Sequence, residues 1–371
     1  MIPVTYSGDL SDYLKFLAYF KQELKKAIER GYIGNLVPIE AGKAQYYYNH
    51  DVNGWQKEKY DEVISAKFPN WKTLSESEKI SAPKEMIHDR SRVFFIYAWG
   101  WMERICHAKP EKLLSFIDFF EKEFSEINDK NTPLYHDVKN MFVIHGYESS
   151  VLKKGKLIEA TGIKVCPYCN RSFVANVVTK NGSVRGLLDH FYPKEKYPYL
   201  AVSRYNLVPS CSYCNSSLGK GNKDPKDEGI ISPFDMIGAK EITFESNITR
   251  GTVLDLDHCA ESIKIRVSSM GIQDLSKNIE TFNLEPLYNS HTDYVAEMYF
   301  KYCKIKTKHY KKYVKNIFSK VRKGQFVFRT LTMDDWKRIV FGVYTDEKDF
   351  GKRPMSKFCV DMLEDFERKG L

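Results

Sequence analysis

Three stretches of the sequence decide the fold: Cys166-Pro-Tyr-Cys169, the run 187–194 that reads Leu-Leu-Asp-His-Phe-Tyr-Pro-Lys, and Cys211-Ser-Tyr-Cys214. In each Cys-x-x-Cys pair the two-residue gap lets both thiolates face one ion, and two such pairs supply the four ligands of a closed tetrahedral zinc site. The competing interpretation is a redox centre or a set of separate buried thiols, and neither explains two pairs with a tyrosine at the same position. We therefore predict one structural Zn²⁺ ion bound by Cys166, Cys169, Cys211 and Cys214.

The charge of the chain is unevenly distributed. The 371 residues carry 57 Lys and Arg against 48 Asp and Glu, a formal net charge of +9. Residues 151–240 alone hold 14 basic and 7 acidic residues, so most of the excess lies in about a quarter of the chain. A local excess of this kind favours a partner that carries phosphate, and we expect the nucleic-acid-facing part of the chain there.

Hydrophobic periodicity predicts helices on both sides of this basic region. Residues 11–30 repeat apolar side chains at helical spacing, and Gly31 follows as a natural stop. Beyond residue 240, β-branched residues alternate with polar ones, as is typical of short strands. We expect an α+β fold divided into a helical region 1–150, a zinc-stapled core 151–240, and a region 241–371 of short strands and then helices. The further helices are expected at about 81–105, 110–127, 134–145, 293–320, 334–343 and 356–368, and the strands at about 241–244, 252–256 and 262–267.

Polar residues suited to chemistry lie between and just after the cysteine pairs. They read Asp-His-Phe-x-Pro-Lys at 189–194, Asn-Leu-x-Pro-x-Cys-x-x-Cys-Asn at 206–215, and then Lys220-Gly221. This pattern resembles the HNH, or ββα-metal, nucleases in their zinc-stapled form. It is most similar to the prokaryotic branch that includes the PtuB-like nucleases of Septu and retron antiphage systems. The resemblance covers about 164–223 and implies a ββα-metal core, and residues 279–284 are loosely similar to sequence that follows the motif in such proteins.

The resemblance implies a role for each of these polar residues. His190 would be the general base, Asp189 and Asn215 would be ligands of one catalytic divalent cation, and Asn206 would brace the loop. Asn215 stands where many members of the family have a final histidine. Because an amide oxygen is a harder ligand than imidazole, this departure favours Mg²⁺, with Mn²⁺ as the alternative, over zinc or nickel in catalysis.

Elementary chemistry supports the same roles. A histidine side chain, which ordinarily titrates at about pH 6.5, can take a proton from water at cellular pH, as His190 would have to do. For Asp189 and His190 taken alone, the default interpretation is a polar turn at the end of a strand. Lys194, Arg204 and Lys220 are candidate phosphate contacts, although a single lysine is more often a solvated surface charge.

The predicted function is that of a metal-dependent HNH endonuclease that hydrolyses phosphodiester bonds in DNA as the effector of a prokaryotic antiphage system. Two alternatives stay open: the same site could act on RNA, such as tRNA, or a zinc-stapled module without catalysis could bind nucleic acid or protein. The sequence has no Gly-x-x-x-x-Gly-Lys-Ser/Thr loop, so the resemblance implies a separate ATPase partner encoded in the same operon. No signal peptide or run of eighteen apolar residues is present, and we expect a cytoplasmic protein with no membrane partner.

Overall fold

The structure, a computed structural model, describes residues 1–31, 33, 87–174, 176–180, 182–184, 186–250, 259–305, 307 and 333–371. Contacts group the chain into two compact units, each assembled from segments that are distant in the sequence. Unit 1 contains Met1–Gly8, Thr161–Leu188 and Pro209–Leu371, and unit 2 contains Asp9–Ala160 and Asp189–Val208. The expected regions 1–150, 151–240 and 241–371 are consecutive in the sequence, whereas the two units are defined by contacts and combine separate segments. The expected division therefore remains a prediction.

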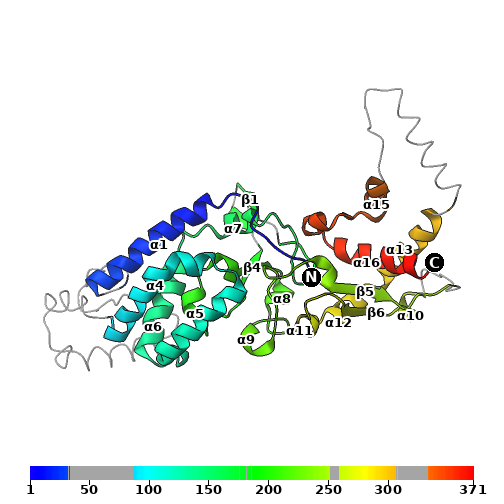
Figure 1. Ribbon diagram of the computed structural model, residues 1–371. Helices are drawn as coiled ribbons and strands as arrows, with labels where there is room; N and C mark the ends of the chain where they lie inside the picture. The colour runs from blue at the N-terminus through cyan, green and yellow to red at the C-terminus, as the bar shows by residue number, and fades with distance from the viewer. Residues whose placement is uncertain are drawn as a thin grey trace, which may run out of the picture. The chain divides into compact units, whose positions relative to one another are not determined.

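Unit 2 is built from helices with buried apolar faces (Figure 1). In α1 (Ser11–Arg30) apolar residues recur every three or four positions, so Phe16, Phe20 and Leu24 share one buried face, and the helix packs against α4. Gly31 ends α1 in the left-handed conformation, with φ 78°. The other helical segments are α4 (Asp89–His107), α5 (Pro110–Glu123), α6 (Pro133–Lys139), α7 (Lys154–Ala160), the 3₁₀ turns η3 (Ser125–Asn128), η5 (Pro198–Leu200) and η6 (Arg204–Asn206), and the π-helical segment η4 (Asn140–Tyr147).

An aromatic cluster in the core of unit 2 includes residues from the short segment Asp189–Val208. The ring centroid of Phe94 in α4 lies 4.5 Å from that of Phe120 in α5 and 5.7 Å from that of Tyr199. Tyr199 is fully buried and lies 4.8 Å from Phe120. Burial of a side chain of this size contributes about 1.5–3 kcal/mol. The segment is therefore packed into the helical core and is not a surface loop.

Hydrogen bonds fix the same segment to the helices of unit 2. Three side chains donate to backbone carbonyls: Tyr13 Oη to Val202 at 2.9 Å, Ser203 Oγ to Ile105 at 2.9 Å, and Tyr192 Oη to Pro110 at 3.1 Å. All of these side chains are buried, so the bonds replace contacts that the hydroxyl groups would otherwise make with water. The segment is thus attached to three different helices.

Unit 1 combines short two-stranded sheets with helices (Figure 1). β1 (Val177–Thr179) pairs with β2 (Gly182–Val184), and β5 (Ile242–Ser246) pairs with β6 (Ile265–Ser269), both antiparallel. β3 (Leu187–His190) pairs with β4 (Leu207–Ser210), and the chain passes from one unit to the other within each of these two strands. The helical segments are α8 (Ser212–Asn215), α9 (Pro225–Glu228), η7 (Ala239–Glu241), α10 (Cys259–Ser262), α11 (Ser276–Thr281), α12 (Leu284–Asn289), α13 (Thr292–Ile305), α15 (Met333–Phe341), η9 (Glu347–Lys352) and α16 (Ser356–Arg368).

Helix side chains complete both edges of the β5–β6 ribbon. The carboxylates of Asp361 and Asp365 in α16 accept hydrogen bonds from backbone N–H groups of β5, at 3.1 and 3.0 Å. On the other edge, Glu285 and Asn289 of α12 accept from backbone N–H groups of β6, at 3.1 and 2.9 Å. An isolated two-stranded ribbon is marginally stable in water, and its open edges invite pairing with other chains. Here the flanking helices satisfy these donors.

Most of the predicted elements within the described residues are confirmed. The helices expected at 11–30 and 356–368 have those bounds, and 110–127 forms α5 followed by η3. The helix expected at 134–145 changes from α6 into the π-helical η4. The helices expected at 81–105, 293–320 and 334–343 correspond to α4, α13 and α15 where they are described.

One strand begins three residues later than predicted, and another predicted strand lies outside the described residues. The strand expected at 262–267 begins only at Ile265, because Ser262 belongs to the short helix α10. The strand expected at 252–256 falls on residues that the structure does not describe. The small helices α7, α11 and α12 were not predicted, since each is too short for apolar periodicity to reveal it. Among the described helices, none combines the length and the apolar character needed to cross a membrane.

Candidate functional site

The first cysteine pair lies in a tight hairpin of unit 1. The N–H of Cys166 donates to the carbonyl of Ser172 at 2.8 Å, and the N–H of Arg171 donates to the sulfur of Cys169 at 3.4 Å. Asn170 between them adopts the left-handed conformation, with φ 53°, which asparagine tolerates better than most residues other than glycine. The turn brings both sulfur atoms of the pair into one group.

The second cysteine pair follows β4 and continues into α8. The N–H of Asn215 donates to the carbonyl of Cys211 at 3.1 Å, and the N–H of Lys220 donates to the carbonyl of Cys214 at 3.0 Å. The second bond folds the following turn back onto the pair. Gly219 lies in that turn, and a Cβ there would come within 2.6 Å of the Cys214 carbonyl oxygen. Glycine is therefore required at this position unless the backbone moves.

The four sulfur atoms form a buried group whose size fits one zinc ion. The Sγ atoms of Cys166, Cys169, Cys211 and Cys214 all lie within 4.8 Å of one another, and those of Cys169 and Cys211 are 3.9 Å apart. A tetrahedron with Zn–S bonds of about 2.3 Å has sulfur–sulfur edges of about 3.8 Å. A disulfide would require about 2.05 Å. The group therefore has the dimensions of a tetrahedral zinc site.

The thiols also influence one another's ionisation. Hydrogen bonding, first of all from Cys166, lowers the pKa of Cys211, so one thiolate is stabilised by its neighbours. Hydrogen bonding with Cys166 and the other thiols raises the pKa of Cys214. Four thiolates confined in this volume would repel one another, and a divalent cation offsets that repulsion because it carries the opposite charge.

A segment distant in the sequence packs against the first pair. The ring of Tyr168 stacks on Phe282 with centroids 4.2 Å apart, and Tyr288 donates a 2.5 Å hydrogen bond to the carbonyl of Cys169. Phe282 belongs to the run 279–284, for which the sequence predicted no contact with the cysteine pair. Tyr288 was missed, because nothing in its local sequence indicates a contact with a cysteine pair.

The backbone of unit 2 orients His190, the last residue of β3. Its Nε2 atom lies 3.2 Å from the carbonyl oxygen of Ala201. A carbonyl oxygen can only accept, so this contact places a hydrogen on Nε2 and leaves the lone pair of the neutral ring on Nδ1. The ring of Tyr147 packs against the imidazole in a T-shaped arrangement, with centroids 4.4 Å apart. His190 is only 7% exposed, so its ring is held in a defined orientation.

Asn206 fixes the chain on both sides of the His190–Ala201 contact. Its Oδ1 accepts from the N–H of Tyr192 at 2.7 Å, and its Nδ2 donates to the carbonyls of Tyr192 and Leu200 at 3.1 Å each. Tyr192 lies two residues after His190, and Leu200 immediately precedes Ala201. Asn206 is fully buried, and its amide links the segment at Tyr192 to the segment at Leu200 inside unit 2.

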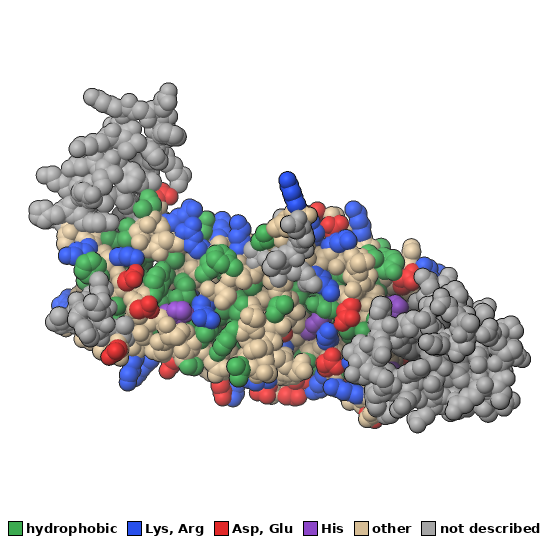
Figure 2. Space-filling view, turned by 180° about the vertical axis from the view of Figure 1, so that it is seen from behind, with side chains coloured by type: hydrophobic (Ala, Val, Ile, Leu, Met, Phe, Trp, Pro, Cys, Tyr) green, Lys and Arg blue, Asp and Glu red, His purple; other side chains and the backbone are tan. Residues whose placement is uncertain are grey.

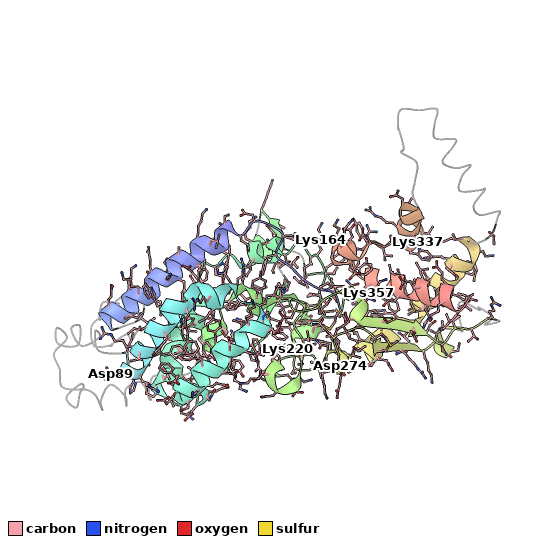
Figure 3. The ribbon with its side chains drawn as sticks, in the orientation of Figure 1. Asp89, Lys164, Lys220, Asp274, Lys337 and Lys357 are labelled. Atoms are coloured by element: carbon pink, nitrogen blue, oxygen red, sulfur yellow. The ribbon has the colours of Figure 1, made fainter. Side chains whose placement is uncertain are left out.

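The remaining predicted site residues lie in different surroundings. Asp189 precedes His190 in β3 and is 3% exposed, and carboxylates buried to this degree are generally paired or bound to a cation. Asn215 ends α8 in unit 1, and its role as a second ligand of the Asp189 cation remains a prediction from the sequence. Lys220, which lies between α8 and α9 in the sequence and is labelled in Figure 3, is buried. Its contact with nucleic acid also stays a prediction.

The predicted phosphate contacts in unit 2 are more accessible. Lys194 is partly exposed and lies 3.6 Å from a carboxylate oxygen of Glu148. The Arg204 guanidinium lies 4.8 Å from the centre of the Tyr205 ring. Figure 2 shows basic and acidic side chains interspersed over the face that it draws, so on that face the positive excess does not gather into one continuous patch.

Comparison with known proteins gives one short similarity. No family model matches the chain. Over 46 residues the chain is 50% identical to the Septu protein PtuB of Bacillus thuringiensis, a match that covers 12% of this chain and 17% of that protein. The similarity thus spans about a sixth of the relative's length. No solved structure matches.

Proposed function

We propose that this protein is a metal-dependent endonuclease of the HNH type that hydrolyses phosphodiester bonds in DNA. The observation that carries the proposal is the orientation of His190, whose Nε2–H faces the Ala201 carbonyl and whose Nδ1 therefore holds the lone pair of the neutral ring. A general base needs this arrangement, because the wrong tautomer cannot accept a proton at the reacting face. The short similarity to PtuB and the zinc-sized cysteine group add support.

In this proposal His190 removes a proton from the water that attacks phosphorus. Asn206 holds both segments that contribute to the orientation of the imidazole, and so acts as a positioning residue. The cysteine group, as a structural zinc site, is separate from the chemistry and stabilises unit 1.

Asp189 is proposed as a ligand of a catalytic divalent cation, Mg²⁺ or Mn²⁺, with Asn215 as the further ligand implied by the resemblance. A carboxylate oxygen is the ligand type that Mg²⁺ prefers, and the near-complete burial of Asp189 agrees with a carboxylate that binds a cation. When bound, such a cation neutralises negative charge that develops on the phosphate oxygens during hydrolysis.

We further propose a role in a prokaryotic antiphage system, together with an ATPase partner. This step rests on the similarity to a protein of the Septu system and on the absence of a phosphate-binding Gly-x-x-x-x-Gly-Lys-Ser/Thr loop from the sequence. Activity assays should therefore be run with and without the product of the neighbouring gene.

Substitution of His190 tests the proposed chemistry. His190→Ala should lower the cleavage rate by about a hundredfold to ten-thousandfold, the range for loss of a general base, while nucleic-acid binding persists. His190→Gln is the sharper variant, since its amide can still donate toward the Ala201 carbonyl but cannot act as a base. His107→Ala, on a partly exposed histidine of α4, is the matched control and should cleave like the wild type. Equal cleavage by wild type and His190→Gln would disprove the role of His190.

Metal titration separates the carboxylate from the base. Cleavage by Asp189→Ala should be partly restored by excess Mg²⁺, because this variant weakens cation binding, whereas His190→Ala should show no recovery. DNA and RNA substrates should be compared in parallel. Cleavage of RNA alone would identify an RNA nuclease, and binding without cleavage in the presence of the partner would identify a binding module.

A further inference from the structure

We propose that Tyr147, Lys154 and Lys194 form a phosphate-binding cluster beside His190, in which Tyr147 positions the imidazole and both ammonium groups. This inference rests on the proposed function, because it assigns the residues that hold the nucleic-acid backbone next to the base. The occupant is a backbone phosphodiester of the DNA substrate. All the residues belong to unit 2.

Tyr147 is the common neighbour of the three other groups. The His190 ring centroid lies 4.4 Å from its ring centroid, the Nζ of Lys154 lies 4.0 Å away, and the Nζ of Lys194 lies 5.4 Å away. Two ammonium groups and the imidazole therefore surround one aromatic ring. Both lysines are only partly exposed, so their ammonium groups are more restricted than those of free surface lysines.

The backbone at Tyr147 is unusual in a way that matches this arrangement. Tyr147 is the last residue of the π-helical segment η4, which follows α6 directly. Single π-helical turns are rare and occur often at functional sites. Gly146 precedes Tyr147, and a Cβ there would come within 2.8 Å of a Val202 methyl group, so glycine allows the segment to lie close to the chain that follows Ala201. The π-helical turn thus places Tyr147 where it meets His190.

The lysines are suited to exchanging their present contacts for a phosphate. A cation above an aromatic ring gains about 0.5–1 kcal/mol at an exposed site, and this contact helps to fix the direction of the ammonium group. Glu148 lies 3.6 Å from the Lys194 ammonium, and the Glu148 side chain is exposed while that of Lys194 is partly exposed. Ion pairs of this kind contribute about 0–1 kcal/mol, so a phosphate oxygen can replace the carboxylate at small cost. Counterion release would then favour binding.

Binding of a labelled DNA duplex by the full-length chain tests the lysines. The measurement is made in the His190→Gln background, so that cleavage does not consume the probe. Lys154→Gln should weaken binding and reduce the slope of log Kd against log salt by about 0.9, the value for one lost phosphate contact. Lys156→Gln is the matched control, since Lys156 lies on the same helix, is exposed, and pairs with Glu159. It should leave the salt slope unchanged.

Cleavage kinetics test the positioning role of Tyr147. Tyr147→Phe keeps the ring and should retain kcat and KM, whereas Tyr147→Leu should lower kcat and raise KM together. Lys154→Gln should raise KM with little change in kcat. Circular dichroism confirms that each variant is folded. Because Tyr147→Phe keeps the ring, it should retain the kcat that Tyr147→Leu loses. Equal kcat for Tyr147→Leu and the wild type would overturn the positioning role.

The outcomes distinguish this inference from the proposed function. A loss of salt slope in Lys154→Gln but not in Lys156→Gln supports the cluster even if the wild type cleaves no substrate. If the wild type cleaves DNA but Lys154→Gln binds with the wild-type salt slope, the phosphate-binding cluster is refuted while the nuclease proposal stands. If the wild type binds no DNA at any salt concentration, both fail.

Discussion

Replacement of Asn206 by alanine should destabilise unit 2 and remove the orientation of His190. The amide of Asn206 is fully buried and makes three hydrogen bonds to the backbone of Tyr192 and Leu200, which flank the His190–Ala201 contact. Alanine would leave a buried N–H group and two carbonyl groups without this partner. The same substitution would therefore affect both the stability of the unit and any activity that depends on His190.

The expected loss follows from the number of bonds. Each hydrogen bond contributes about 1 kcal/mol net, so three bonds correspond to a loss of about 3 kcal/mol. For a folded unit of this size a loss of 1 kcal/mol lowers Tm by about 2–4 °C, so we expect a shift of about 6–12 °C for unit 2. Asn206→Asp should be at least as destabilising at neutral pH, because it keeps the shape but places a carboxylate against two carbonyl oxygens.

Urea unfolding combined with amide hydrogen exchange provides the assay, since exchange reports on unit 2 separately. Asn131→Ala is the matched control, because Asn131 is exposed and belongs to the same unit. Its substitution should change the free energy of unfolding by less than about 0.5 kcal/mol. If Asn206→Asp proves as stable as the wild type, shape and not hydrogen bonding keeps Asn206 in place, and the reasoning is wrong.

Two further predictions concern the cysteines. Elemental analysis should find one zinc ion per chain. Cys214→Ser should lose the metal and unfold unit 1, because the free energy of metal binding contributes directly to folding in such sites. A folded protein without zinc would contradict this. Burial raises the pKa of Cys106 from 9.0 to about 12. The pKa of Cys106 is higher in the folded protein than in the unfolded chain, so above pH 9 the thiol ionises more readily in the unfolded chain. The free energy of unfolding should therefore be unaffected below pH 9 and should fall by about 1.4 kcal/mol per pH unit between pH 9 and pH 12. Urea titrations should therefore show a smaller alkaline loss for Cys106→Ala, and equal losses would count against this assignment.

Features that depend only on neighbouring residues could be predicted from the sequence. The helix at 11–30 follows from apolar residues three or four positions apart and from a terminal glycine, and both features are present in α1. The cysteine group was predictable for a similar reason, because two residues between ligands fix the geometry of each pair.

Contacts between distant segments could not be predicted in this way. The sequence around Tyr147 reads as the end of an ordinary helix, and only the π-helical turn brings its ring against His190. The carboxylates of Asp361 and Asp365 read as the polar face of an amphipathic helix, yet they accept hydrogen bonds from a strand more than a hundred residues away in the sequence. Periodicity indicates which side of a helix is polar, but it does not indicate which segment of the chain that side will contact.

The construction of unit 2 from two separated segments has a consequence for synthesis on the ribosome. The helices within Asp9–Ala160 are synthesised before Tyr199, which fills their aromatic core. At about 5–20 residues per second, translation of the chain from Ala160 to Tyr199 takes roughly 2–8 s. During that interval the apolar faces that will receive Tyr199 are open to water and to chaperones. Because His190 is oriented by Ala201 and braced by Asn206, a nascent or truncated chain that stops between these residues carries the proposed base in an inactive form.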